Sequence, residues 1–286
     1  MAGRTGRKVL LIVTVVIAAV IFLASILPGI IGGAGGGKIG VVEVEGTIAD
    51  LKDVMADIVR FKEDKGILGV VVRINSPGGA VGPTQEAASE LKKLKAVKKV
   101  YVSMGSVCAS GGYYIAAVGE KLYANPSTIT GSIGVIMQQT VVEELMKKIG
   151  VQSNTIKAGA MKDVGSPFRK MTDNERQYLQ DIINNIHEQF IKDVAAGRKM
   201  PLDKVRSLSD GRIYTGLQAK EAGLIDGIGT FYDVVDDMKK AVGITGKPEL
   251  VYGKRPFAPL KWLFSSMARE MLGREQADPF QYKYAP

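Results

Sequence analysis

A serine among small residues, in a chain with one histidine, bears most directly on the chemistry of this sequence. Ser110 lies in the run 105–114 (GSVCASGGYY), directly after the apolar run 100–104. Small neighbours let the chain turn sharply and let a substrate backbone approach. A serine hydroxyl is a weak nucleophile that needs a base, usually a histidine. Because His187 is the only histidine, a catalytic Ser110 points to a lysine base that burial keeps neutral.

Two other segments offer groups that such a serine would need. The run 73–79 (RINSPGG) has backbone N–H groups at Gly78 and the adjacent Gly79 that can face a ligand, as an oxyanion hole requires. Lys162, in the run 157–169 (KAGAMKDVGSPFR), is the candidate base. Each feature by itself also has a plain structural explanation. Pro-Gly-Gly occurs in many turns, serine suits tight packing, and a lysine is ordinarily solvated.

The remaining reactive side chains have structural interpretations. His187 lies in the helical pattern 172–196 beside the core-facing Ile186 and Phe190, so we expect it on the wetter side and not in catalysis. Cys108 is the only cysteine, which excludes an internal disulfide, and we interpret it as a small core residue. A reactive thiol is the alternative. The sequence holds no His- or Cys-rich cluster and no nucleotide fingerprint, so we expect no metal and no cofactor.

The N-terminal segment favours a membrane anchor. Residues 9–31 form an uncharged, mostly apolar run that is long enough to cross a bilayer. A cleavable signal peptide is the competing interpretation, but its apolar region is normally shorter, and the glycine-rich 32–37 offers no clear cleavage site. Arg4, Arg7 and Lys8 precede the run, which predicts a cytoplasmic N-terminus. We therefore expect a single-pass protein of the cell (inner) membrane with a periplasmic or extracellular domain.

Composition sets broad limits. The 286 residues are 46% hydrophobic, enough for one large domain or two small ones. The net charge of +9 is spread along the chain and no nucleic-acid motif stands out, so we expect no nucleic-acid partner. A solvated surface explains the basic excess, and attraction to anionic lipid near the anchor is the functional alternative.

Periodicity predicts an α/β architecture. Strand patterns cover 39–44, 67–74, 100–104 and 154–156, and helical patterns cover 53–61, 83–94, the segment after Ser110, 141–149, 172–196 and 231–242. The run 67–74 is nearly continuous in β-branched residues, as expected of a strand buried on both faces. Thr172 with Glu175 fits a capping box. Two successive strand–turn–helix units argue for a parallel, helix-covered sheet.

In this order and behind an N-terminal anchor, the segments resemble the signal peptide peptidase A family in its short, single-domain form. These are membrane-anchored serine peptidases of the Clp protease/crotonase fold superfamily. The resemblance covers about residues 38–253. Besides the runs above, it includes 130–135 (TGSIGV), 211–219 (GRIYTGLQA) and 223–226 (GLID). It implies a Clp protease/crotonase-like core of parallel strands and helices, preceded by one transmembrane helix.

The resemblance also implies a role for particular residues. Ser110 matches the nucleophile and Lys162 the general base of the family. Ser132 matches a serine that hydrogen-bonds the base and orients it. The backbone amides of Gly78 and Gly111 match the oxyanion donors.

The expected organisation follows from these matches. The chain divides into a cytoplasmic N-terminus (1–8), a transmembrane helix (9–31), a glycine-rich tether (32–37), a peptidase domain (38–253) and a C-terminal tail (254–286). The tail contains apolar residues that could form an amphipathic helix packing on a neighbour or touching the membrane. These residues are Trp262, Leu263, Phe264, Met267, Met271 and Leu272.

The expected activity is that of a serine endopeptidase with a Ser/Lys dyad, cleaving apolar peptides, above all signal peptides released from their precursors. Related assemblies build their sites inside rings, so we expect a homo-oligomer and hypothesise a closed ring of eight subunits. Membrane lipid around the N-terminal helix is the other expected partner. Two alternatives stay open: a crotonase-type acyl-CoA enzyme, and a non-catalytic membrane scaffold of the same fold.

Overall fold

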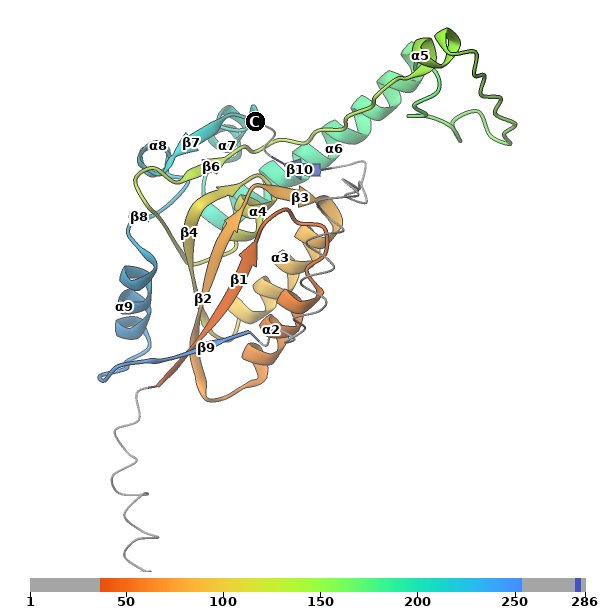
Figure 1. Ribbon diagram of the computed structural model, residues 1–286. Helices are drawn as coiled ribbons and strands as arrows, with labels where there is room; N and C mark the ends of the chain where they lie inside the picture. The colour runs from red at the N-terminus through yellow and green to blue at the C-terminus, as the bar shows by residue number, and fades with distance from the viewer. Residues whose placement is uncertain (1–36, 254–280, 284–286) are drawn as a thin grey trace, which may run out of the picture.

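A computed structural model describes residues 37–253 and 281–283 of the chain. Within these ranges an eight-stranded, mostly parallel sheet carries helices on both faces (Figure 1). This confirms the mixed α/β core. The predicted transmembrane segment 9–31 and the greater part of the tail, 254–280, lie outside the described residues. Of the helices in the described ranges, none combines the length and the apolar character that a bilayer crossing requires.

The sheet is built around three long parallel strands. Its order is β7-β6-β4-β2-β1-β9, and β5 pairs with both β4 and β8. All pairs in this sheet are parallel except β6 with β7. The strands are β1 (Lys38–Glu45), β2 (Ile67–Ser76), β4 (Lys99–Ala109), β5 (Lys121–Ala124), β6 (Ile129–Gly131), β7 (Ile213–Thr215), β8 (Gly227–Ile228) and β9 (Glu249–Tyr252).

Alternate side chains of the central strands enter two separate apolar layers. In β2, Val70 and Val72 belong to the larger core cluster, while Val71 between them belongs to the smaller cluster on the other face. All three are fully buried. The β-branched run of β2 is therefore apolar throughout because both sides of the sheet are covered.

Helices supply the two covering layers. The larger cluster includes buried residues of α2, α3, α4 and α6, whereas α9 packs on the opposite face. The helices are α2 (Lys52–Glu63), α3 (Val81–Lys95), α4 (Gly111–Ala116), α5 (Glu143–Lys148), α6 (Asp173–Arg198), α7 (Leu202–Ser207), α8 (Gly216–Ala222) and α9 (Phe231–Ala241). The helices expected between residues 53 and 242 are thus confirmed, with ends shifted by a few residues.

An arm, formed by α5, the loop 149–172 and the N-terminal half of α6, extends away from the sheet (Figure 1). Helix α6 begins with the predicted capping box of Thr172 and Glu175. The prediction of a strand at 154–156 is wrong, because this exposed part of the loop has no regular structure. A short β-branched run forms a strand only where another strand offers backbone hydrogen bonds.

A second, two-stranded sheet lies at one end of the main sheet. The short strand β3 (Gly78–Ala80) pairs antiparallel with β10 (Gln281–Lys283). The run 73–79, whose Pro-Gly-Gly is typical of a turn, thus contains the start of a strand. Gly79 packs against the backbone of Ile48, where an added Cβ would lie 2.1 Å from the Ile48 carbonyl oxygen.

We expect Phe190→Ala to lower the free energy of unfolding by about 3–5 kcal/mol, because a fully buried aromatic side chain is removed. The Phe190 ring packs on Tyr114 of α4 with ring centroids 5.0 Å apart, so the change also loosens α6 from α4. Urea titration measures the difference. Tyr178→Ala, at a 47% exposed site on the same helix, is the control. Equal losses in the two variants would contradict the assigned core.

Candidate active site

Three parallel strands, β2, β4 and β6, end side by side. Ser76 of β2 pairs with Cys108 of β4, and Cys108 pairs in turn with Thr130 of β6. One residue further, Ala109 pairs with Gly131. Ligands of open α/β sheets bind outside the carboxyl ends of the strands, so this edge is the place to look for a site.

Ser110 occupies the turn between β4 and α4. Its backbone has φ 52° and ψ −115°, which is rare for a residue with a side chain and costs about 1–3 kcal/mol. Two hydrogen bonds hold it there: its N–H donates to the carbonyl of Gly131 (2.8 Å), and its carbonyl accepts from Tyr114 N–H (2.8 Å). The Oγ is buried and has no hydrogen-bond partner among the described residues. A strained serine with an unused hydroxyl is typical of a functional position.

Ser132 lies next to this turn. It follows Gly131, whose carbonyl accepts the Ser110 N–H, and it has the same φ of 52°. Its N–H donates to the carbonyl of Arg212 (2.8 Å), and the residue is buried. The structure therefore brings two of the predicted site residues, Ser110 and Ser132, together as two strained serines.

Gly78 and Gly111 lie at the same edge. Gly78 has φ 96°, which favours glycine, and its N–H donates to Ser76 Oγ (3.1 Å). Gly111 is the first residue of α4 and is buried. The helix start approaches the β2–β3 turn so closely that a Cβ on Gly112 would lie 2.9 Å from the Ser76 carbonyl oxygen. Both predicted amides are therefore near Ser110, although that of Gly78 already has a partner.

Lys162 is separated from these residues within one chain. Its side chain is exposed, and it belongs to the loop 149–172 on the arm. Figure 1 shows this loop at the N-terminal end of α6, away from α4, which begins directly after Ser110. Burial of Lys162, which the sequence led us to expect, is not provided by its own chain.

His187 lies in a different environment from the one that the sequence predicted. The expectation that His187 faces water is wrong: it is half-buried, and its Nε2 lies 3.2 Å from the carbonyl oxygen of Ile133. A carbonyl only accepts, so Nε2 donates and cannot take a proton from a serine at that atom.

Cys108 is fully buried, and burial raises the pKa of its thiol, as expected of an inert core cysteine. In the described part of the chain, no group of three or more acidic, His or Cys side chains could hold a metal.

Comparison with known proteins decides between the peptidase and acyl-CoA interpretations. Residues 92–245 match the model of peptidase family S49. The chain belongs to this family. The matched range includes Ser110, Ser132 and Lys162, and it begins after Gly78.

The relatives of this S49 peptidase differ in length, so the aligned region covers different shares of them. A candidate signal peptide peptidase SppA of Enterococcus faecium is 37% identical over 234 residues, which cover 77% of this chain and 68% of that protein. A candidate protease of Synechocystis sp. is 43% identical over 197 residues, covering 68% and 71%. Protease 4 of Haemophilus influenzae is 33% identical over 72% of this chain but only 35% of its own length. The family match and the protease relatives together identify the chain as a serine peptidase.

An ion-pair cluster that the sequence analysis did not single out holds the loop of this S49 peptidase that carries Lys162. The Arg169 guanidinium bonds both oxygens of Asp163, each at 2.8 Å, and both oxygens of Glu175, at 2.5 and 2.8 Å. Lys157 also pairs with Asp163. The hydrogen bonds from Arg169 lower the pKa of Asp163 and bring that of Glu175 to about 2. The spacing Asp163–Arg169–Glu175 was visible in the sequence, but nothing local showed that the three converge.

We expect Arg169→Gln to raise the pKa of both carboxyls toward their ordinary values and to loosen the loop 157–169. Folding lowers the pKa of Glu175, so its ion pair stabilises the arm above an ordinary carboxyl pKa of about 4 and loses its effect as the pH falls toward 2. Carbon-13 NMR titration of labelled Asp and Glu, with trypsin cleavage of the loop, measures both effects. Arg176→Gln, at an exposed site one turn into α6, should leave both unchanged. Identical titrations in the two variants would show that Arg169 does not organise the loop.

Proposed function

We propose that this chain is a membrane-anchored endopeptidase with a Ser110/Lys162 dyad that cleaves apolar peptides, signal peptides in particular. The observation that carries the proposal is the hydroxyl of Ser110, which is buried, unbonded and held on a strained turn. Strain of this kind persists only where the surrounding structure enforces it. Membership of peptidase family S49 supports the role of nucleophile for that hydroxyl, and the name of the Enterococcus faecium relative points to signal peptides as the substrate.

In the proposed reaction, Ser110 Oγ attacks the peptide carbonyl carbon while its proton passes to the neutral amine of Lys162. The amides of Gly111 and Gly78 stabilise the oxyanion, and for this the Gly78 N–H must exchange Ser76 Oγ for the substrate oxygen. The carbon–nitrogen bond then breaks, and Lys162 returns the proton to the leaving amine. Water hydrolyses the resulting ester with Lys162 again as base, and Ser132 orients the lysine.

Lys162 reaches a serine, in this proposal, on a neighbouring copy of the chain. Two features support an assembly: the arm places Lys162 away from the Ser110 turn of its own chain, and it exposes apolar side chains that another subunit could cover. These side chains are Leu145, Ile149, Val151, Ile156 and Phe168. Cover by a neighbour would also exclude water and favour the neutral amine. A closed ring, which we propose has eight subunits, joins every serine with a lysine.

The membrane is the proposed location. The apolar run 9–31 crosses the inner membrane with the N-terminus in the cytoplasm, and the peptidase domain lies in the periplasm or outside the cell. Apolar peptides left in the bilayer after precursor processing would then reach the site without leaving the membrane surface. This gives the anchor a purpose in the reaction.

We expect Ser110→Ala and Lys162→Ala each to reduce the turnover of a fluorogenic apolar peptide by at least about 10⁴-fold, because each removes a group that forms or breaks bonds. The matched controls are Ser127→Ala, in an exposed turn, and Lys170→Ala, on the same arm. Both controls should retain near-normal turnover. Near-normal turnover by Lys162→Ala would show that the base lies elsewhere.

Mixing the two inactive variants tests the shared site. Random assembly gives about a quarter of the sites an intact serine from one copy and an intact lysine from the next, so turnover should return to about that fraction. If the mixture remains inactive while assembly is intact, serine and lysine belong to one chain.

We expect kcat/KM to rise from neutral toward alkaline pH, because a general base must be unprotonated to accept the proton of Ser110. Asp163 and Glu175, the carboxylates bound to Arg169, have lowered pKa values and stay ionised over this range, so they do not produce the rise. A pH titration of kcat/KM from 6 to 10 measures the effect. A flat profile would contradict a lysine base.

A further inference from the structure

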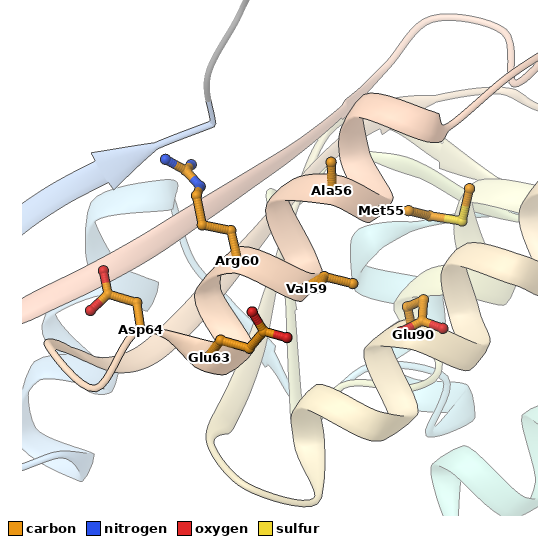
Figure 2. A pocket seen from close by; sticks show the side chains of 7 residues that line it. All are labelled: Met55, Ala56, Val59, Arg60, Glu63, Asp64 and Glu90. Atoms are coloured by element: carbon orange, nitrogen blue, oxygen red, sulfur yellow. The ribbon is translucent and has the colours of Figure 1, made fainter.

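A groove between α2 and α3 lies away from the Ser110 turn. It has a volume of about 770 Å³. Met55, Ala56 and Val59 form an apolar stripe along α2, and Glu90 of α3 faces it (Figure 2). Glu63, one further lining residue, has no ion pair or hydrogen bond within the described part of the chain. The proposed reaction does not use this groove.

The segment 254–280, which lies outside the described residues, begins and ends at the helical layer that contains the groove. At its start, the carbonyl of Tyr252 accepts a hydrogen bond from Arg60 Nη2 (3.2 Å), and Arg60 lines the groove. At its end, β10 pairs with β3 and contacts α4. The 27 residues 254–280 therefore leave beside α2 and return on the same side of the sheet.

The sequence of that segment matches the groove. Between 260 and 272 an apolar stripe recurs at helical spacing, and one face of such a helix must be covered. The stripe consists of Leu260, Leu263, Phe264, Met267 and Met271. Over its full length, 254–280, the segment has five basic residues, Lys254, Arg255, Lys261, Arg269 and Arg274, and three acidic residues, Glu270, Glu275 and Asp278, so it is net basic. Its charge is thus opposite to that of the acidic groove residues Glu63, Asp64 and Glu90.

The lengths also agree. A helix over 260–272 would be about 20 Å long, close to the roughly 18 Å of α2. The six residues before it and the eight after it can each bridge more than about 18 Å when extended. The segment can therefore lie along α2 and still deliver β10 to β3.

We propose that residues 260–272 form an amphipathic helix that docks in the groove between α2 and α3 of the same chain. Its apolar stripe covers Met55, Ala56 and Val59, and its basic residues lie beside Glu63 and Asp64. Glu90 is already paired with Lys93 (2.6 Å), so it contributes less. The docked helix anchors the tail whose end pairs with β3, next to Gly78. The proposal does not depend on the dyad or the substrate.

Cysteine cross-linking tests the docking directly, because the only native cysteine, Cys108, is fully buried. The full chain in detergent carries Val59→Cys at the middle of the groove and Met267→Cys at the middle of the segment. With a short bis-maleimide we expect an intrachain cross-link about tenfold more abundant than with Tyr232→Cys and Met267→Cys, since Tyr232 is exposed on α9 across the sheet. Equal yields would overturn the proposal, and so would cross-links only between chains, which would indicate a second copy in the groove.

A matched pair of aspartates gives a second readout. Met267→Asp places a charge on the apolar stripe and should speed trypsin cleavage at Lys261 and Arg269 about tenfold, because the docked segment is released. Ser265→Asp adds the same charge on the opposite side of the helix and should leave the rate unchanged. Equal rates would overturn the proposal. Protection of the segment only when lipid vesicles are added would overturn it as well, and would assign the stripe to the membrane.

Discussion

The hydrogen bond from Ser110 N–H to the Gly131 carbonyl is the constraint on which the described site depends. It joins the end of β4 to the end of β6 and keeps Ser110 in a conformation that it would not adopt in a free chain. The parallel register of β2, β4 and β6 brings these strand ends together. Core packing on both faces of the sheet maintains that register, so the strain at Ser110 is opposed by burial throughout the domain.

The same register explains why one chain holds only part of the proposed machinery. Ser110, Ser132, Gly78 and Gly111 belong to elements at one edge of the sheet, whereas the chain after Ser132 leaves that edge and builds the arm. The arm is not loosely attached: Arg169 joins the loop that carries Lys162 to the start of α6, and α6 is packed on α4 through Phe190. A rigid arm can present a lysine to another subunit in a defined position, which is the property that a shared dyad would require.

The region around β3 links the site to the end of the described chain. One side of β3 approaches Ile48, and the other pairs with β10, so the strand that begins at Gly78 is covered by a distant segment of sequence. In main-chain pairing of this kind, backbone hydrogen bonds give an extended peptide its affinity for a sheet edge. A helix docked in the groove between α2 and α3, as proposed above, would therefore hold the tail close to the proposed oxyanion donor.

The sequence by itself determined the local elements of this protein. The β-branched run of β2, the capping box at Thr172 and the strand–turn–helix order around Ser110 are properties of neighbouring residues, and local patterns encode them. Only the tertiary structure decided how far β4 extends, since its last residues are a strand because β6 pairs with them. The same holds for the strained turn at Ser110, the bond between His187 and Ile133, the convergence of Arg169 with two carboxylates, and the position of Lys162 on the arm. These features depend on strand register and on the path of the loops through space, which residue spacing along the chain does not record.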